Sequence, residues 1–199
     1  MLVIGLTGGI GCGKSTVCNL LRNYDDTRVF DSDEEAKNIL LSKDFRPKAI
    51  QILGTEALRD GWIDTEKTAA IIFNDEQRRK QLELALHPLV FLEMKSQMIL
   101  AEAADIDIFV IESAILFETR LNEYCDGTVA VTCNYPEQIR RLTELRGMTV
   151  DDAKLRISVQ MPEQARNNLA DLLIGTDCQL DEVRARVKYM HNYLIKTYS

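Results

Sequence analysis

The sequence predicts an α/β fold in which helices cover both faces of a doubly wound, five-stranded parallel sheet. Short, continuous apolar runs recur along the chain, and segments with helical periodicity separate them. Such runs are typical of parallel strands, because these strands are covered on both faces. The predicted strands lie at residues 2–7, 27–31, 107–112, 128–133 and 171–175.

Between these strands, apolar residues at helical spacing predict helices. Pro136 and the capping pair Thr149 and Asp152 mark two of the helix starts. In the last helix, apolar residues recur every three or four positions, as on a face that packs against a core. These residues are Leu180, Val183, Val187, Met190 and Leu194. The predicted helices span residues 14–23, 34–41, 136–146, 150–160 and 180–196.

The stretch at 42–104 is strongly helical and contains no convincing strand. Asp64 is expected to cap one of its helices, and Asn74 with Gln77 forms a capping box for a long one. Pro88 is expected to kink or break that long helix. The pattern favours a helical insertion between two strands of the parallel sheet.

The composition is that of an ordinary soluble globular protein, with 46% hydrophobic and 28% charged residues among 199. A formal net charge of −7 argues against nucleic acid or an anionic membrane as the main partner. No apolar run approaches the ~20 residues of a membrane span, and the first residues lack the features of a signal peptide. Five cysteines without a C-x-x-C pair predict free thiols in a reducing cytoplasm. The sequence does not indicate an oligomeric state.

The most informative motif follows the first predicted strand and opens a predicted helix. Gly8, Gly13, Lys14 and Ser15 match the phosphate-binding loop pattern G-x-x-x-x-G-K-[ST] in the context that this motif requires. Glycines let successive backbone N–H groups turn inward, and the helix N-terminus adds positive potential, so we expect the loop to bind a nucleoside triphosphate. Lys14 is expected to reach the β- and γ-phosphates, and the Ser15 hydroxyl to complete the coordination of Mg²⁺.

The other residues of this loop are expected to contact ATP mainly through their backbone. Cys12 lies inside the loop and is the cysteine that we expect to be most reactive. The predicted ATP-binding residues of the loop are Gly9, Gly11, Cys12, Gly13, Lys14, Ser15 and Thr16.

Phosphate-loop proteins include switches, motor-like ATPases and small-molecule kinases. The chain has no N-K-x-D guanine reader, as a GTPase would need, and no L-S-G-G-Q-like stretch, as a transporter-type ATPase would need. A kinase requires an acid near the acceptor hydroxyl, a segment that covers the substrate, and arginines that neutralise charge in the transition state. The helical insertion is the candidate for the covering segment.

Acidic residues follow two predicted strands. Asp31 and Asp33 are two positions apart, which on an extended stretch places them on the same side. One of them then orients the attacking hydroxyl and the other binds through metal or water; alternatively, both cap the next helix. Glu112 ends its strand where a metal-side acid commonly sits, and it is equally compatible with a simple strand-end acid.

A group of arginines follows the fourth predicted strand. Together with Glu144, the arginines of the helix at 136–146 are also compatible with a solvated, salt-bridged helix face. The candidates are Arg140, Arg141, Arg146, Arg156 and Arg166.

Two stretches make the chain resemble the dephospho-coenzyme A kinase family. The opening Ile4-Gly-Leu-Thr-Gly-Gly-Ile-Gly-Cys-Gly-Lys-Ser-Thr16 matches the start of that family, and Phe30-Asp-Ser-Asp33 matches its V-I-D-A-D. Further matches in family order cover nearly the whole chain. They are Asp60-Gly61, Ile63-Asp64, Leu82-Glu83, His87-Pro88, Leu116-Phe-Glu118, the arginines at 140–146, Gln160 and Ala170-Asp171.

The resemblance implies a kinase that transfers the γ-phosphoryl group of ATP to the ribose 3′-hydroxyl of dephospho-CoA, with Mg²⁺, to give CoA and ADP. Asp33 would be the catalytic base or the group that positions the hydroxyl, and Lys14 and Arg140 would stabilise charge on the transferred phosphoryl group. Arg140 would also contact ATP. The substrate-binding residues implied are Thr7, Asp33 and His87.

The resemblance also implies a layout for the single kinase domain. The helical insertion at 42–104 would shape the dephospho-CoA pocket, and the segment at 136–165 would act as a lid that excludes water. Trp62 would either cover the substrate or fill a gap in the core. The remaining core would consist of residues 1–41, 105–135 and 166–199.

The chain departs from the family pattern at two places. In the family motif D-x-P-L-L-F-E, Glu112 replaces the leading aspartate and Ala114 replaces the proline. After the last strand, Thr176-Asp177-Cys178 stands where the family has N-x-G. Two other functions remain compatible with the motifs: another small-molecule kinase, such as a nucleoside monophosphate kinase, and a non-catalytic nucleotide switch.

Overall fold

The computed structural model describes residues 1–198 and divides into two compact units. The first unit comprises Met1–Asp31 and the chain from Ile99 onward, and the second comprises Ser32–Met98. Each unit has a buried apolar cluster of its own.

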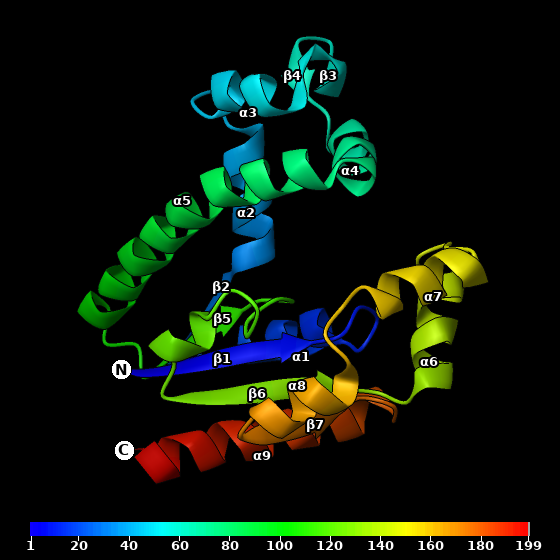
Figure 1. Ribbon diagram of the computed structural model, residues 1–199. Coiled ribbons are helices and arrows are strands. Elements are labelled where there is room, and N and C mark those ends of the chain that lie inside the picture. The colour runs from blue at the N-terminus through cyan, green and yellow to red at the C-terminus, as the bar shows by residue number, and fades with distance from the viewer. Residues whose placement is uncertain (199) are drawn as a thin grey trace. The chain divides into compact units, whose positions relative to one another are not determined.

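The first unit contains a five-stranded sheet in which every strand pairing is parallel (Figure 1). The strand order is β2-β5-β1-β6-β7, so the first strand lies at the centre. This confirms the predicted doubly wound sheet, and all five strand positions agree with the sequence prediction to within one residue at either end. The strands are β1 (Leu2–Gly8), β2 (Thr27–Asp31), β5 (Ile108–Glu112), β6 (Gly127–Thr132) and β7 (Leu172–Gly175).

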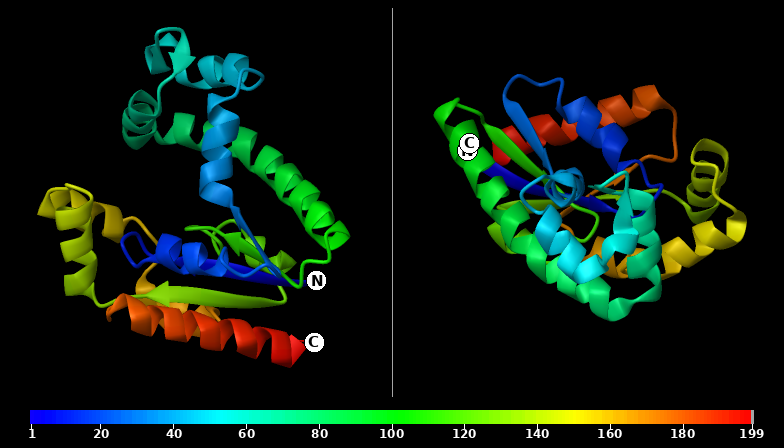
Figure 2. Two further views of the ribbon diagram at one scale, coloured as in Figure 1. Left: turned by 180° about the vertical axis from the view of Figure 1, so that it is seen from behind. Right: turned by 90° about the horizontal axis from the view of Figure 1, so that it is seen from above.

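Helices α1 and α9 contact each other and lie side by side (Figure 2). Both pack on the same cluster of apolar side chains of the sheet. Of the predicted apolar stripe on α9, four residues are buried, but Leu180 is 48% exposed. Leu180 is the first residue of the helix, so it precedes the turns that pack against the sheet. The helices of the first unit are α1 (Lys14–Leu21), η2 (Leu121–Tyr124), α6 (Tyr135–Arg140), η3 (Arg141–Leu145), α7 (Val150–Ser158), α8 (Glu163–Leu169) and α9 (Leu180–Tyr198).

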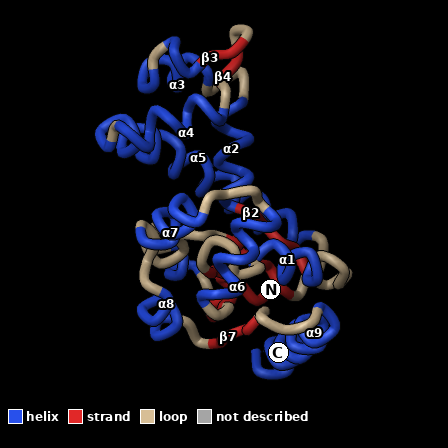
Figure 3. The backbone as a smooth tube through the Cα atoms, turned by 90° about the vertical axis from the view of Figure 1, so that its right-hand side faces the viewer, coloured by secondary structure: helices blue, strands red, loops and turns tan. Residues whose placement is uncertain are grey.

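The second unit is mainly helical, as the sequence predicted, but it also contains a small hairpin (Figure 3). Strands β3 and β4 pair antiparallel around Asp60 and Gly61, which adopt φ values of 53° and 82°. Positive φ at both central residues is what a tight hairpin turn requires, so the expectation of no strand here was wrong. The elements are α2 (Ser32–Leu41), α3 (Arg46–Leu53), η1 (Thr55–Ala57), β3 (Leu58–Arg59), β4 (Trp62–Ile63), α4 (Thr65–Asn74) and most of α5 (Glu76–Ala103).

The helix starts of the second unit test two predicted caps. Asp64 caps α4, since its carboxylate accepts a hydrogen bond from the Lys67 backbone N–H at 2.9 Å. The capping box predicted at Asn74 is wrong, because Asn74 is the last residue of α4. Asp75 caps α5 instead, accepting from the Arg78 N–H at 2.9 Å. A carboxylate one residue further on thus provides the acceptor that the new helix needs.

Helix α5 continues through Pro88 over 28 residues, so the proline does not break it. Leu86 and Val90, on either side of the proline, are both buried. Tertiary packing of this kind supplies most helical stability and offsets the hydrogen bond that proline cannot make. Neither this long helix nor any other within residues 1–198 is apolar enough over a sufficient length to cross a membrane.

Candidate nucleotide-binding site

The predicted phosphate loop connects the central strand β1 to helix α1 at the carboxyl edge of the sheet. Gly11 and Gly13 adopt φ values of 77° and 88°, in the left-handed region that strains residues with a side chain. A Cβ atom on Gly13 would also lie 3.1 Å from the Thr176 hydroxyl oxygen. These two positions therefore require glycine, and they give the loop the turn that the motif predicts.

Lys14 is the first residue of α1, and its ammonium group reaches back over the loop. Its Nζ atom donates to the Gly8 carbonyl oxygen at 3.0 Å. Ser15 and Thr16 follow in the same exposed first turn. The N-cap of α1 is Gly13, which has no side chain that could bind the first backbone N–H groups of the helix. A helix start of this kind favours anions.

Two glutamine side chains hold Ile10 in the middle of the loop. The Oε1 atom of Gln160 accepts from the Ile10 backbone N–H at 2.8 Å. Gln138 donates from Nε2 to the Ile10 carbonyl oxygen at 2.6 Å, and its side chain is buried. Gln138 lies on α6 and Gln160 follows α7, so the segment predicted as a lid contacts the loop directly.

The last strand also contributes to the loop. The Thr176 hydroxyl, just after β7, donates to the Cys12 carbonyl oxygen at 2.7 Å. Arg141 donates from Nη1 to Thr176 Oγ1 at 2.9 Å and to the Gly11 carbonyl oxygen at 3.3 Å. Thr176 and Arg141 thus connect the loop to the end of β7 and to the start of η3, which directly follows α6.

Arg140 shares the acceptor Glu137 with its neighbour Arg141, but its other hydrogen bond goes to Glu144 and not to the loop. Its guanidinium group donates to Glu137 at 2.7 and 2.8 Å and to Glu144 at 2.8 Å. Hydrogen bonds from Arg140, together with the nearby Arg141, lower the pKa of the Glu137 carboxyl to about 2. These contacts agree with the alternative that the arginines of this segment form a solvated, salt-bridged helix face. A role for Arg140 towards ATP stays a prediction.

Glu112 ends β5 in register with Asp31 of β2 on one side and Leu6 of β1 on the other. Burial raises the pKa of the Glu112 carboxyl, and the neighbouring Asp31 carboxylate raises it further. A hydrogen bond with Cys18 and the charge of Lys14 act in the opposite direction. The carboxyl groups of Glu112 and Asp31 therefore lie at neighbouring strand ends next to the loop, where two negative charges would repel each other.

Two of the predicted substrate-site residues, Asp33 and His87, belong to the second unit. Asp33 lies in the first turn of α2, and His87 lies within α5. Because α2 begins at Ser32, Asp31 and Asp33 do not share an extended stretch, and the expectation that strand alternation puts them on one side was wrong. Carboxylates in the first helical turn interact favourably with the helix dipole, so the capping alternative gains support. Thr7, the third such residue, is buried in β1.

Some contacts of the loop had no signal in the sequence. Gln138 and Cys133 lie in no motif, and Gln160 was noted only through the family resemblance. Thr176 is marked in the sequence only by the departure from the family pattern after the last strand. All four residues contact the loop from more than 120 positions away in the chain. These contacts could be predicted only from the order of the strands in the sheet, which determines the segments that lie next to the loop.

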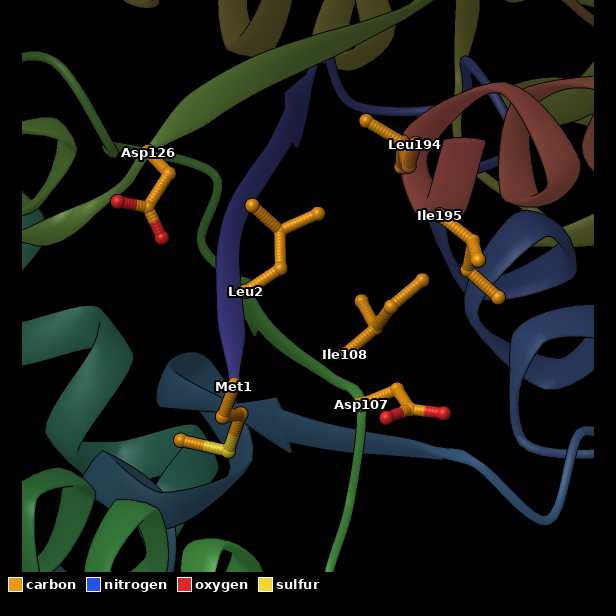
Figure 4. A pocket seen from close by; sticks show the side chains of 7 residues that line it. All are labelled: Met1, Leu2, Asp107, Ile108, Asp126, Leu194 and Ile195. Carbon is orange, nitrogen blue, oxygen red and sulfur yellow. The ribbon is translucent and has the colours of Figure 1, made fainter. Parts of the chain in front are cut away.

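A separate cavity lies at the opposite edge of the sheet, at the amino ends of β1 and β5 (Figure 4). Asp107 and Asp126 contribute carboxylates there, and Asp126 accepts a hydrogen bond from the Val3 N–H at 2.8 Å. Ligands of doubly wound sheets bind beyond the carboxyl ends of the strands, which is the edge that carries the loop. The cavity is therefore not part of the nucleotide site.

A parallel, doubly wound sheet with this loop between its central strand and the first helix defines a phosphate-loop nucleotide-binding protein. The comparisons with known proteins narrow this class. The family model described as dephospho-CoA kinase matches residues 2–182. The dephospho-CoA kinase of Shouchella clausii is 38% identical over 178 residues, which are 87% of this chain and 89% of the relative. The chain belongs to the dephospho-CoA kinase family.

Solved structures agree with this fold. The crystal structure of TT1252 from Thermus thermophilus superposes with a TM-score of 0.80 at 26% identity and covers 97% of both chains. The dephospho-CoA kinase from Campylobacter jejuni superposes with a TM-score of 0.64 at 19% identity and covers 96% of both chains. At that identity the second likeness establishes the fold only.

Proposed function

We propose that this chain transfers the γ-phosphoryl group of ATP to the ribose 3′-hydroxyl of dephospho-CoA, which gives CoA and ADP. The observation that carries the proposal is the phosphate loop, with its two left-handed glycines and with Lys14 folded over it. Membership of the dephospho-CoA kinase family indicates dephospho-CoA as the acceptor of the phosphoryl group. In the reaction, the hydroxyl oxygen attacks the γ-phosphorus, the bond to the β–γ bridging oxygen breaks, and the hydroxyl loses its proton.

We assign the chemical roles as follows. Lys14 leaves the Gly8 carbonyl and binds the β- and γ-phosphates, where its charge stabilises the transferred group. Asp33 accepts the proton of the hydroxyl or orients that hydroxyl, and a loose transition state makes orientation the larger contribution. Arg140 adds positive charge once it exchanges its carboxylate partners for phosphate oxygens.

The hydroxyl and carboxylate oxygens beside the loop are of the kind that Mg²⁺ prefers as ligands. Within residues 1–198, no three His, Cys, Asp or Glu side chains group into a metal cluster. Magnesium in kinases is held by one or two carboxylates together with substrate phosphates, so such a cluster is not needed. The Ser15 hydroxyl, with Asp31 and Glu112 at the neighbouring strand ends, would hold the ion. When bound, it neutralises charge on the phosphate oxygens.

Substrate binding is assigned to the remaining predicted residues and segments. His87 and Asp33, in the helical second unit, and Thr7 at the end of β1 would contact dephospho-CoA. The helical insertion predicted at 42–104 would form the walls of this site. The segment at 136–165 would act as the lid, and its contacts with Ile10 support that assignment. Trp62 is 53% exposed, which favours covering a substrate over filling the core.

We also propose a cytoplasmic location. All five cysteines are free thiols, as is usual for proteins of a reducing compartment.

One assay separates the proposed function from its alternatives. ADP release from ATP is measured with dephospho-CoA, with a panel of nucleoside monophosphates and with no acceptor. Release that depends on dephospho-CoA, with a new phosphate ester on its ribose 3′-oxygen by NMR, supports the proposal. Release only with a monophosphate identifies a nucleoside monophosphate kinase. ATP binding without release to any acceptor identifies a nucleotide switch, and both results reject the proposal.

A further inference from the structure

Two cysteines lie together under the phosphate loop. Cys12 belongs to the loop itself, and Cys133 directly follows Thr132, the last residue of β6. Their Sγ atoms are 3.4 Å apart, and the residues are only 2% and 3% exposed. Strands β1 and β6 are adjacent, with Gly8 opposite Val131, so the sheet brings the two cysteines together. The pair therefore depends on the fold and not on a C-x-x-C motif.

The hydrogen bonding within this pair is asymmetric. The Cys133 thiol donates to the Cys12 sulfur, and this hydrogen bond lowers the pKa of Cys12 to about 7. The Arg166 guanidinium also favours the Cys12 thiolate, whereas burial and the Glu163 carboxylate oppose it. The same hydrogen bond and burial raise the pKa of Cys133, against the nearby Arg141. The hydrogen bond thus favours a thiolate at Cys12 beside a thiol at Cys133, the combination that disulfide formation requires.

We propose that Cys12 and Cys133 form a reversible disulfide that switches off nucleotide binding, which makes the pair a redox modification site of this chain. The oxidant is a small hydroperoxide. The Cys12 thiolate attacks the terminal peroxide oxygen, the O–O bond breaks, Cys12 becomes a sulfenic acid, and the other oxygen leaves as hydroxide or alkoxide and takes up a proton. The Cys133 sulfur then attacks the Cys12 sulfur, the S–S bond forms, and the sulfenic oxygen leaves as water. With hydrogen peroxide the two thiols lose two electrons, and the peroxide becomes two waters.

The disulfide changes the loop because the sulfur atoms must approach each other. A disulfide bond is about 2.05 Å long, so the present separation must shorten by about 1.4 Å. Cys12 lies between Gly11 and Gly13, the two residues whose conformation shapes the loop, and its carbonyl binds Thr176. A shift of Cys12 therefore moves the backbone N–H groups that are to bind the phosphates. This step rests on the proposed function of the loop.

The first test uses the reduced, full-length protein. It is treated with hydrogen peroxide, and ATP affinity, intact mass and the peptides after digestion are measured before and after dithiothreitol. We expect a mass loss of about 2 Da and a linked peptide that joins Cys12 to Cys133. We also expect ATP affinity to fall by at least ~10-fold, since the loss of one hydrogen bond to a charged phosphate group weakens binding by about this factor. Dithiothreitol should restore both.

Two variants provide matched controls. The ATP affinity of Cys133→Ser should be the same before and after peroxide, because no partner sulfur remains. Cys178→Ser changes a cysteine outside the pair, so it should stay as sensitive as the unaltered protein. Saturating ATP should slow formation of the disulfide in the unaltered protein, a measurement that does not depend on whether a variant folds.

Three results would overturn the proposal: no linked peptide, a linked peptide with unchanged ATP affinity, or an equal loss of affinity in Cys133→Ser. The readouts separate this proposal from the proposed function. A protein that binds ATP but does not phosphorylate dephospho-CoA would reject the kinase and leave the switch standing. A reduced protein that binds no ATP would reject the nucleotide site, and the linked peptide would still report the disulfide chemistry by itself.

Discussion

Gln160 accepts a hydrogen bond from the backbone N–H of Ile10 at 2.8 Å, across 150 positions of the sequence. Gln138 donates to the carbonyl oxygen of the same residue at 2.6 Å. The two side chains differ in what they supply, one an acceptor and the other a donor. Ile10 is thereby held on both sides by the segment that follows β6.

This difference gives a matched pair of substitutions. Gln160→Glu and Gln138→Glu each add one negative charge beside Ile10, but only Gln160→Glu keeps the required acceptor. We expect Gln138→Glu to weaken ATP binding about 3- to 10-fold more than Gln160→Glu, the range of one neutral hydrogen bond. Calorimetric titration with ATP measures the difference. Equal affinities for the two variants would show that the glutamines do not orient the loop through these bonds.

Lys14 is expected to be essential for turnover. Its ammonium group already lies over the loop, 3.0 Å from the Gly8 carbonyl oxygen. Lys14→Ala should abolish phosphoryl transfer, because Lys14 is the only cationic residue of the loop that can reach the β- and γ-phosphates. Steady-state kcat with dephospho-CoA is the measurement, with the melting temperature as a check on folding. A near-normal kcat would rule out the assigned role.

Asp33 is expected to act on the acceptor and not on ATP. Asp33→Asn should lower kcat by at least ~10²-fold, the scale typical of general acid–base groups, and leave the Kd for ATP unchanged. Glu34→Gln, a change in the same helical turn, is the control and should retain kcat. If Asp33→Asn keeps its full kcat while Asp31→Asn loses it, the role passes to Asp31.

Alanine substitutions of Arg140 and Arg141 are expected to change different quantities, namely kcat and the Kd for ATP. Arg141 contacts the loop and Thr176, so Arg141→Ala should raise the Kd for ATP. Arg140 is assigned to the transition state, so Arg140→Ala should lower kcat with little change in that Kd. Comparing kcat with the Kd for ATP in both variants is the measurement. A rise in the Michaelis constant for ATP alone would make Arg140 a binding residue.

The stability of the protein should depend on pH through Glu112. Burial, followed by the Asp31 charge, raises the pKa of this carboxyl in the folded state above 4.5, while Cys18, Lys14 and Arg22 oppose that shift. The protonated Glu112 carboxyl therefore contributes its full stabilisation to the free energy of unfolding below the unfolded-state pKa. This stabilisation is lost as pH rises through the folded-state pKa. Glu112→Gln removes this loss, because an amide does not ionise.

Denaturant unfolding between about pH 4 and pH 8 tests this expectation. The free energy of unfolding of Glu112→Gln relative to the unaltered protein should increase with pH across that range. Glu118→Gln, at a carboxyl shortly after the same strand, is the control for a general effect of charge removal. A difference that is constant with pH would mean that Glu112 titrates alike in both states.

The sequence determined the features that depend on neighbours along the chain. The strand, glycine loop and helix at residues 2–21 follow from apolar runs, from glycines that tolerate positive φ, and from helical periodicity. The Asp64 cap is of the same kind, since its carboxylate binds a backbone N–H only three residues away. The family followed from these local motifs as well.

Only the tertiary structure decided which distant side chains reach the loop. Gln138, Gln160 and Thr176 contact it because β6 and β7 lie on one side of β1, an order that no local pattern encodes. Packing on both sides of Pro88 likewise preserved a helix that the proline alone was expected to interrupt. Local interactions depend on residues within a few positions, whereas these contacts arise only when the whole sheet assembles.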